Sequence, residues 1–136
     1  MAGCDGVLRG IDPGAGSEVL TVEIEAYVGG STAVGSHLAY VGTFEIQVLG
    51  IDLTAGKVAW VYENPERHFP FYSSAALAPD RVVIGGRDKL VHALDPATGR
   101  AVWTYAAGSR VDSSPVIAGA SVYFGTIGGD LVGLDL

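Results

Sequence analysis

The chain has 136 residues, 49% of them hydrophobic, which is enough apolar material for the core of one domain and too much for a disordered chain. Its formal net charge is −7, with only 8 lysines and arginines and no basic stripe, which argues against nucleic-acid partners and against an anionic membrane surface. No apolar run approaches the ~18 residues that would span a bilayer, so we expect no membrane insertion. Cys4 is the single cysteine, so no internal disulfide forms, and we expect a buried thiol at the end of a strand.

A short sequence motif occurs four times along the chain. It consists of an apolar run that ends in an aspartate, as in Leu8–Asp12. The four aspartates are spaced by 40, 43 and 40 residues, and they are Asp12, Asp52, Asp95 and Asp135. A period of about 40 residues, built from short apolar runs and glycine-rich turns, is typical of a β-propeller with one four-stranded blade per repeat. The sequence therefore predicts an all-β fold.

The predicted strands occur in the same order and at equivalent positions in each repeat. The chain enters near the end of a second strand at 2–4, and each later unit begins after a serine-containing pair at 31–32, 73–74 or 113–114. In each unit the third strand is the recurring motif. The fourth strand, where present, carries a large apolar residue eight positions after the aspartate. We predict about three and a half blades of an incomplete ring, WD40-like in strand order, with a partial blade at 1–30, blades at 31–71 and 72–111, and a partial blade at 112–136.

Two interpretations of the incomplete ring stay open. Either the chain is a piece of a longer protein that supplies further blades, or several copies of the chain complete one ring together. Open propeller edges motivate the second interpretation, because an exposed sheet edge carries unpaired backbone groups that favour pairing between copies.

The repeat resembles a known family. Residues 95–103 resemble the Asp-x-x-Thr-Gly-x-x-x-Trp core of the pyrroloquinoline-quinone-like propeller repeat, and residues 52–60 match it with Ala55 in place of threonine. Residues 12–20 are a weaker copy that lacks both threonine and tryptophan. The resemblance implies that each tryptophan wedges between blades and that the Thr-Gly turn braces it. If Trp103 is a core residue, Trp103→Ala should lower the free energy of unfolding by about 3–5 kcal/mol. The repeat anchors are Asp52, Gly56, Trp60, Asp95, Gly99 and Trp103.

The functions of that family set the expectations for this chain. The family includes quinone-dependent dehydrogenases, propellers of outer-membrane barrel assembly and many exported proteins. Its enzymes bind quinone and calcium around a whole ring, often with a vicinal cysteine pair, and we assign no catalytic, cofactor or metal residue here. We expect a non-catalytic scaffold for a protein or peptide, within a larger periplasmic or extracellular protein. The alternatives are a fragment of a dehydrogenase that uses pyrroloquinoline quinone and calcium, and a self-assembling half-propeller.

Residues 1–5 carry neither a basic nor an apolar region of the kind that marks a secretory signal. We therefore expect no signal peptide within this chain.

The segment 67–72 is the least repeat-like part of the chain and contains Arg67, His68, Phe69, Phe71 and Tyr72. It falls in the loop between one blade's outer strand and the next blade's inner strand, where an exposed arginine, histidine and aromatic residues would suit a peptide or flat ligand. In the alternative, Phe69 and Phe71 fill the gap between blades and Arg67 pairs with an acid such as Glu66.

Charged residues in the neighbouring turns extend this candidate partner face. Arg87 and Asp88 lie in a tight turn, and Arg110 and Asp112 precede a serine pair. Asp112 could orient a ligand, or Arg110 and Asp112 could bond nearby backbone. Turn acids at equivalent places could form an acidic rim for a cation or a basic partner, or could reflect ordinary turn chemistry. These acids are Asp5, Glu45, Asp88 and Asp130.

Overall fold

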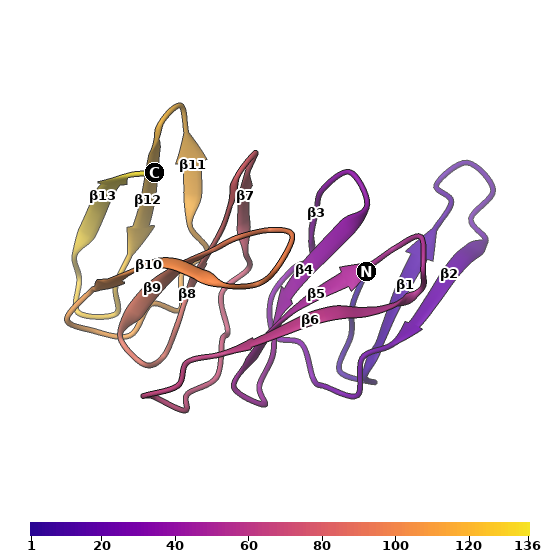
Figure 1. Cartoon of the computed structure of the whole chain (residues 1–136), viewed down its shortest axis with the longest axis horizontal. Helices are drawn as coiled ribbons and strands as arrows, with labels where there is room; N and C mark the ends of the chain where they lie inside the picture. The colour runs from indigo at the N-terminus through magenta and orange to yellow at the C-terminus, as the bar shows by residue number, and fades with distance from the viewer.

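The computed structural model describes residues 1–136 and contains four antiparallel sheets without a helix (Figure 1). The first sheet pairs β1 (Val7–Ile11) with β2 (Glu18–Glu23). The second holds β3 (Ala33–Val34), β4 (Leu38–Gly42), β5 (Gln47–Asp52) and β6 (Lys57–Glu63). The third holds β7 (Ala76–Ala78), β8 (Arg81–Gly85), β9 (Leu90–Leu94) and β10 (Ala101–Ala106). The fourth holds β11 (Val116–Ala118), β12 (Ser121–Gly125) and β13 (Leu131–Asp135).

The sheets stand side by side as an open series of propeller blades, as Figure 1 shows. Within each sheet the strands are hydrogen-bonded in chain order, and a bridge between Ala2 and Leu8 adds the end of a further strand to the first sheet. The predicted all-β fold with an incomplete ring is therefore confirmed. The structure holds no helix long and apolar enough to cross a membrane.

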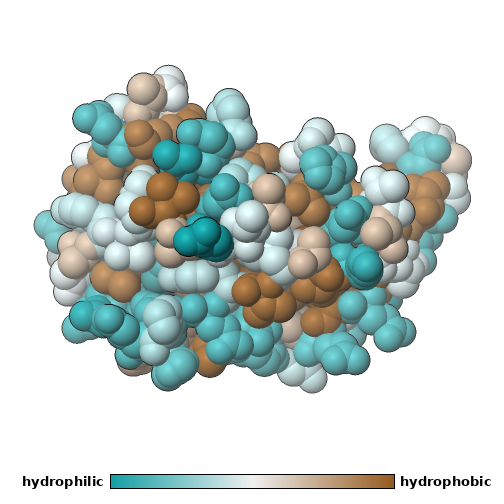
Figure 2. All heavy atoms as spheres, in the orientation of Figure 1, coloured by the Kyte–Doolittle hydropathy of each residue, from teal (hydrophilic) through white to brown (hydrophobic).

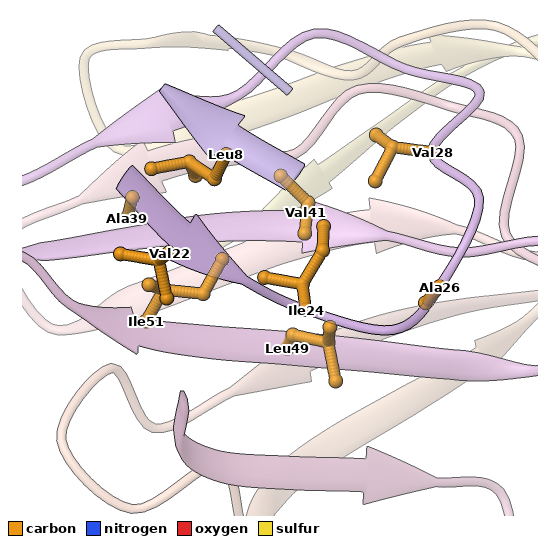
Figure 3. Packing of buried hydrophobic residues seen from close by; sticks show 9 residues of the cluster. All are labelled: Leu8, Val22, Ile24, Ala26, Val28, Ala39, Val41, Leu49 and Ile51. Atoms are coloured by element: carbon orange, nitrogen blue, oxygen red, sulfur yellow. The ribbon is translucent and has the colours of Figure 1, made fainter. Parts of the chain in front are cut away.

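The core lies between adjacent sheets rather than within any one of them. Three separate clusters of buried side chains fill the three junctions between neighbouring blades. In the junction of Figure 3, residues of the first sheet and its following loop meet β4 and β5 of the second, and the cluster consists of Leu8, Val22, Ile24, Ala26, Val28, Ala39, Val41, Leu49 and Ile51. Each blade is therefore stabilised by its neighbours, because a single sheet cannot bury both of its faces alone.

The recurring aspartate builds the turn between the third and fourth strands. The Asp95 Oδ1 accepts hydrogen bonds from the backbone N–H groups of Ala97 and Thr98, both at 2.9 Å. The N–H of Gly99 then donates to the Asp95 carbonyl at 2.9 Å, with Gly99 at a φ of 72° that favours glycine. The same bonds form at Asp52 and at Asp12. The same side-chain bonds thus recur in each of the three turns that join a third strand to a fourth.

These turns predict a dependence of stability on pH. Backbone N–H donors, Ala55 first, hold the pKa of Asp52 below its ordinary value of 3.8, and the N–H of Thr98 does the same for Asp95. A carboxyl group whose pKa is lower in the folded state stabilises the fold above its ordinary pKa, and this contribution is lost as the pH falls through the folded value. In Asp52→Asn/Asp95→Asn the amide oxygen can still accept the bonds but does not titrate. We expect urea unfolding of this variant to lose less stability between about pH 5 and about pH 2 than the wild type loses. Equal losses in the two proteins would contradict this.

The inner strands differ in register by one residue from the sequence alignment. Ala33 pairs with Tyr40 as Ala76 pairs with Val83, so Ser31 occupies the position of Ser74 rather than that of Ser73. The backbone N–H of Ser31 donates to the Ser74 hydroxyl at 2.8 Å, and the N–H of Ser74 donates to the Ser114 hydroxyl at 3.0 Å. The aligned serines therefore connect successive blades at the start of their inner strands.

Cys4 is exposed, which corrects the expectation of a buried thiol. Its sulfur lies 3.8 Å from the carbonyl oxygen of Val28, in the loop that leads to the second sheet.

Candidate binding surface

Three loops meet at one end of the strands, at the junctions around the third blade. They are the 64–75 loop between β6 and β7, the 86–89 turn between β8 and β9, and the 107–115 loop between β10 and β11. The 95–99 turn lies at the opposite end of β9. The loops lie along the lower left of Figure 1, where Figure 2 shows mainly hydrophilic atoms.

Backbone hydrogen bonds join these loops into one frame. The N–H of Arg87 donates to the Pro70 carbonyl at 3.2 Å, which fixes the first loop to the turn. The N–H of Val111 donates to Gly86 at 3.1 Å and that of Ala107 to Lys89 at 2.9 Å, which fixes the third loop. The backbone that carries these side chains is therefore ordered before any ligand arrives, which lowers the entropic cost of binding.

The three loops border a cavity of about 490 Å³ that is open to solvent. Its lining includes four of the eight lysines and arginines of the chain, drawn from all three loops, and consists of Arg67, Phe69, Arg87, Asp88, Lys89 and Arg110. A chain with a net charge of −7 thus concentrates half of its cationic side chains at one place.

Arg87 is neutralised within the surface. Its guanidinium group forms two hydrogen bonds with the Asp112 carboxylate, at 3.0 and 2.9 Å, and the bond to Asp112 raises the pKa of Arg87. The guanidinium carbon also lies 3.8 Å from the ring centroid of Tyr72. Tyr72 in turn meets Phe44 edge to face at 4.7 Å. Phe44, Tyr72, Arg87 and Asp112 thus form a continuous row across two blade junctions.

The other three cations of the cavity have no acidic partner. Arg67 donates a hydrogen bond from Nη1 to the backbone carbonyl of Asp88 at 2.8 Å, instead of pairing with Glu66. Lys89 and Arg110 form no ion pair in the structure. Because Arg67 uses one of its five N–H donors, most of its guanidinium group is available to a ligand.

A buried polar network supports the turn beneath the cavity. The Asp88 side chain, 1% exposed, accepts hydrogen bonds from Asn64 at 2.7 Å and from the N–H of Leu90 at 3.0 Å, and lies 3.0 Å from His92 Nε2. On its other side, His92 Nδ1 lies 3.1 Å from the Tyr62 hydroxyl. Burial alone would raise the pKa of Asp88, but the bonds to His92, Asn64 and Leu90 outweigh it and lower that pKa.

The structure separates the residues of the predicted partner face into two groups. Phe71 is fully buried between blades and Asp88 is buried within the network, so neither can be part of an exposed face. Phe69 is 50% exposed, and Arg67, His68 and Arg110 are also exposed. The expectation that Phe69 and Phe71 share one role is therefore wrong, because Phe71 packs in the core between two blades while Phe69 remains exposed.

The four turn acids do not gather into an acidic rim. Asp5 pairs with Arg9 at 2.6 Å, Glu45 accepts the N–H of Tyr27 at 3.0 Å, and Asp88 is buried. No group of three or more histidine, cysteine, aspartate or glutamate side chains is arranged to hold a metal ion. Asp130 bonds with Thr126 of its own turn, so each of the four acids has a partner in its own surroundings.

Sequence reasoning missed Lys89, which has a left-handed backbone with φ of 69°. The equivalent turn position is Gly6 in the first blade and Gly129 in the last, both at positive φ, and Ile46 in the second. A comparison of the four turns is the signal that could have found it. A side chain costs about 1 kcal/mol in this conformation, so we expect Lys89→Gly to raise the free energy of unfolding by about 0.5–1 kcal/mol. Urea unfolding checks this against Lys89→Ala, which keeps the strain. A destabilised glycine variant would contradict it.

Antiparallel blades of up to four strands, with cores between the sheets and a repeated turn from an aspartate to a glycine four positions later, define a propeller module of the pyrroloquinoline-quinone-like repeat type. The family model described as outer membrane protein assembly factor BamB matches residues 4–136, and the chain belongs to this family.

One curated protein and two solved structures are similar to nearly the whole chain, and the two structures show its fold. The curated outer membrane protein assembly factor BamB of Nitrosomonas eutropha is 27% identical over 97% of this chain and 32% of its own length. The crystal structure of BamB from Moraxella catarrhalis superposes with a TM-score of 0.83 and 23% identity, over 98% of this chain and 40% of that one. The computationally designed Ika4 protein shares the fold at a TM-score of 0.78 and 16% identity, over 98% of this chain and 81% of that one. The chain thus spans about a third of the curated relative.

Proposed function

We propose that this chain is a protein-binding segment of a periplasmic propeller that acts as a scaffold in outer-membrane protein assembly. Its relatives are named as outer membrane protein assembly factors, which supports this setting. The observation that carries the proposal is the frame of three loops around the cavity, where Arg67, Phe69, Lys89 and Arg110 are presented by hydrogen-bonded backbone.

The chemistry of this surface suits a protein partner. An exposed aromatic ring and arginine side chains are the groups that contribute most to binding at protein interfaces. The buried network beneath the 86–89 turn and the bonds between the loops hold the backbone of this surface in place without a partner, so binding would cost little entropy for ordering the loops.

Photo-crosslinking in the native host cell tests the proposal. We expect p-benzoylphenylalanine at Phe69 to form a discrete crosslink to a component of the outer-membrane assembly machinery, identified by mass spectrometry. The same group at Ala97, which is exposed on the turn at the opposite end of β9, is the control. Crosslinks from Ala97 but none from Phe69 would overturn the assignment of this surface.

A further inference from the structure

We propose that the cavity binds an acidic polypeptide segment, whose carboxylates pair with Arg67, Lys89 and Arg110 while an apolar side chain of the segment packs on Phe69. This inference rests on the proposed function and names the chemistry of the partner at the same surface.

Charge is the first argument for an acidic ligand. The cavity gathers Arg67, Lys89 and Arg110 without an acidic partner for any of them, although the chain as a whole has excess acid. Like charges that converge on one cavity repel one another and destabilise the fold, so folding alone does not explain them. A ligand that carries several carboxylates removes this repulsion when it binds.

The backbone at Lys89 is the second argument. Lys89 has a left-handed backbone conformation, at a turn position that glycine occupies in two of the other three blades. Strain of this kind concentrates at functional positions, where a side chain is needed despite its cost. Lys89 is exposed at the cavity and its ammonium group forms no ion pair, which fits a role towards a ligand rather than in the fold.

The geometry of the donors favours carboxylates. Arginine presents a planar fork of N–H groups that pairs with a carboxylate through two hydrogen bonds. The carbonyl of Asp88 orients the Arg67 guanidinium at 2.8 Å, and Arg87, which also lines the cavity, is held by Asp112 at 2.9 Å. Phe69 adds an apolar contact that is 50% exposed in the free chain.

A polypeptide fits better than an anionic membrane. A lipid surface brings a plane of negative charge towards the whole chain, whose net charge of −7 would repel it. A flexible acidic segment can place its carboxylates at the cavity alone, and screening within about 10 Å limits repulsion from the rest of the chain.

Fluorescence anisotropy with the purified chain tests the inference. The probe is a fluorescein-labelled glutamate-rich peptide with one central phenylalanine, compared with the same peptide in which glutamine replaces glutamate. We expect only the glutamate peptide to bind, with an affinity that falls about tenfold as salt rises from about 50 mM to about 300 mM. Each of Arg67→Gln, Lys89→Gly and Arg110→Gln should weaken binding about threefold, and the triple variant about thirtyfold.

The matched control is Lys57→Gln/Arg100→Gln, which removes two exposed cations that do not line the cavity. We expect it to change binding less than twofold, as a rough limit for a general charge effect. Lys89→Gly separates binding from folding, because the variant should be more stable and yet bind less well. Equal binding of the two peptides, an equal loss in the control, or preferential binding to phosphatidylglycerol vesicles would overturn the inference.

The two proposals fail in different ways. If Phe69 crosslinks to an assembly component that the triple variant still binds equally well, the acidic ligand is wrong and the protein-binding surface stands. If the peptide binds as expected but Phe69 gives no crosslink in the cell, the ligand chemistry stands and the proposed function is wrong.

Discussion

Trp60→Ala should lower the free energy of unfolding by about 3–5 kcal/mol, the range for removing a large aromatic residue from a core. Trp60 is only 9% exposed, on the outer strand β6 of the second blade. Its Nε1–H donates to the Pro96 carbonyl at 2.9 Å, and its ring lies against Gly99 in the turn of the next blade. The ring also lies 5.8 Å from that of Tyr40. The substitution therefore removes packing and a hydrogen bond that join two blades.

Trp103→Ala is the matched comparison. The sequence assigns both tryptophans the same role, but Trp103 is half-exposed beside Leu134 and Leu136 and its indole N–H makes no hydrogen bond. We now expect it to cost only about 1–2 kcal/mol, because less apolar surface leaves water. Urea unfolding followed by far-ultraviolet circular dichroism measures both variants. A smaller loss for Trp60→Ala than for Trp103→Ala would contradict the role of Trp60 as a wedge between blades.

Asp88→Ala should lower the free energy of unfolding by a similar amount, about 3–5 kcal/mol, because the substitution removes one member of a buried polar network. The Asn64 amide and His92 Nε2 would lose the carboxylate that lies beside them, in a region closed to water. Asp80→Ala is the control, since Asp80 is exposed and pairs only with the neighbouring Arg81. We expect the control to change stability by less than about 0.5 kcal/mol.

A double-mutant cycle tests whether this loss arises in the network. Asp88→Ala, His92→Leu and the double variant, each unfolded in urea, give the coupling free energy between the two side chains. We expect coupling above about 1 kcal/mol, because residues in one hydrogen-bond network do not act independently. Additive losses, or a loss below about 1 kcal/mol for Asp88→Ala alone, would mean that the network does not hold the turn.

The repeat was predictable because its turns depend on bonds between residues that are close together in the sequence. Asp12, Asp52 and Asp95 each form their turn with residues two to four positions ahead, so the motif, its spacing and the strands around it can be found in one sequence. The wedge at Trp60 followed from the same pattern. The register of the inner strands could not be predicted from this pattern. Adjacent serines such as Ser73 and Ser74 look alike in the sequence, and only strand pairing distinguishes them.

The candidate surface was predictable in outline but not in detail. The non-repeating segment at 67–72 indicated a special loop, yet nothing local says that Phe71 turns into the core and Phe69 does not. Asp88 is buried and bonds with Asn64 of the preceding loop, a contact between residues 24 positions apart that the local sequence does not indicate. The gathering of Arg67, Lys89 and Arg110 likewise depends on how three loops meet in space.

Amide hydrogen exchange of the chain with and without the glutamate-rich peptide tests most directly the claim that this surface is where the propeller binds its partner. We predict slower exchange on peptide binding in residues 67–72, 86–89 and 107–112, with no change in the 95–99 turn at the opposite end of β9. Protection of the 95–99 turn instead, or unchanged exchange in all three loops at saturating peptide, would contradict the claim.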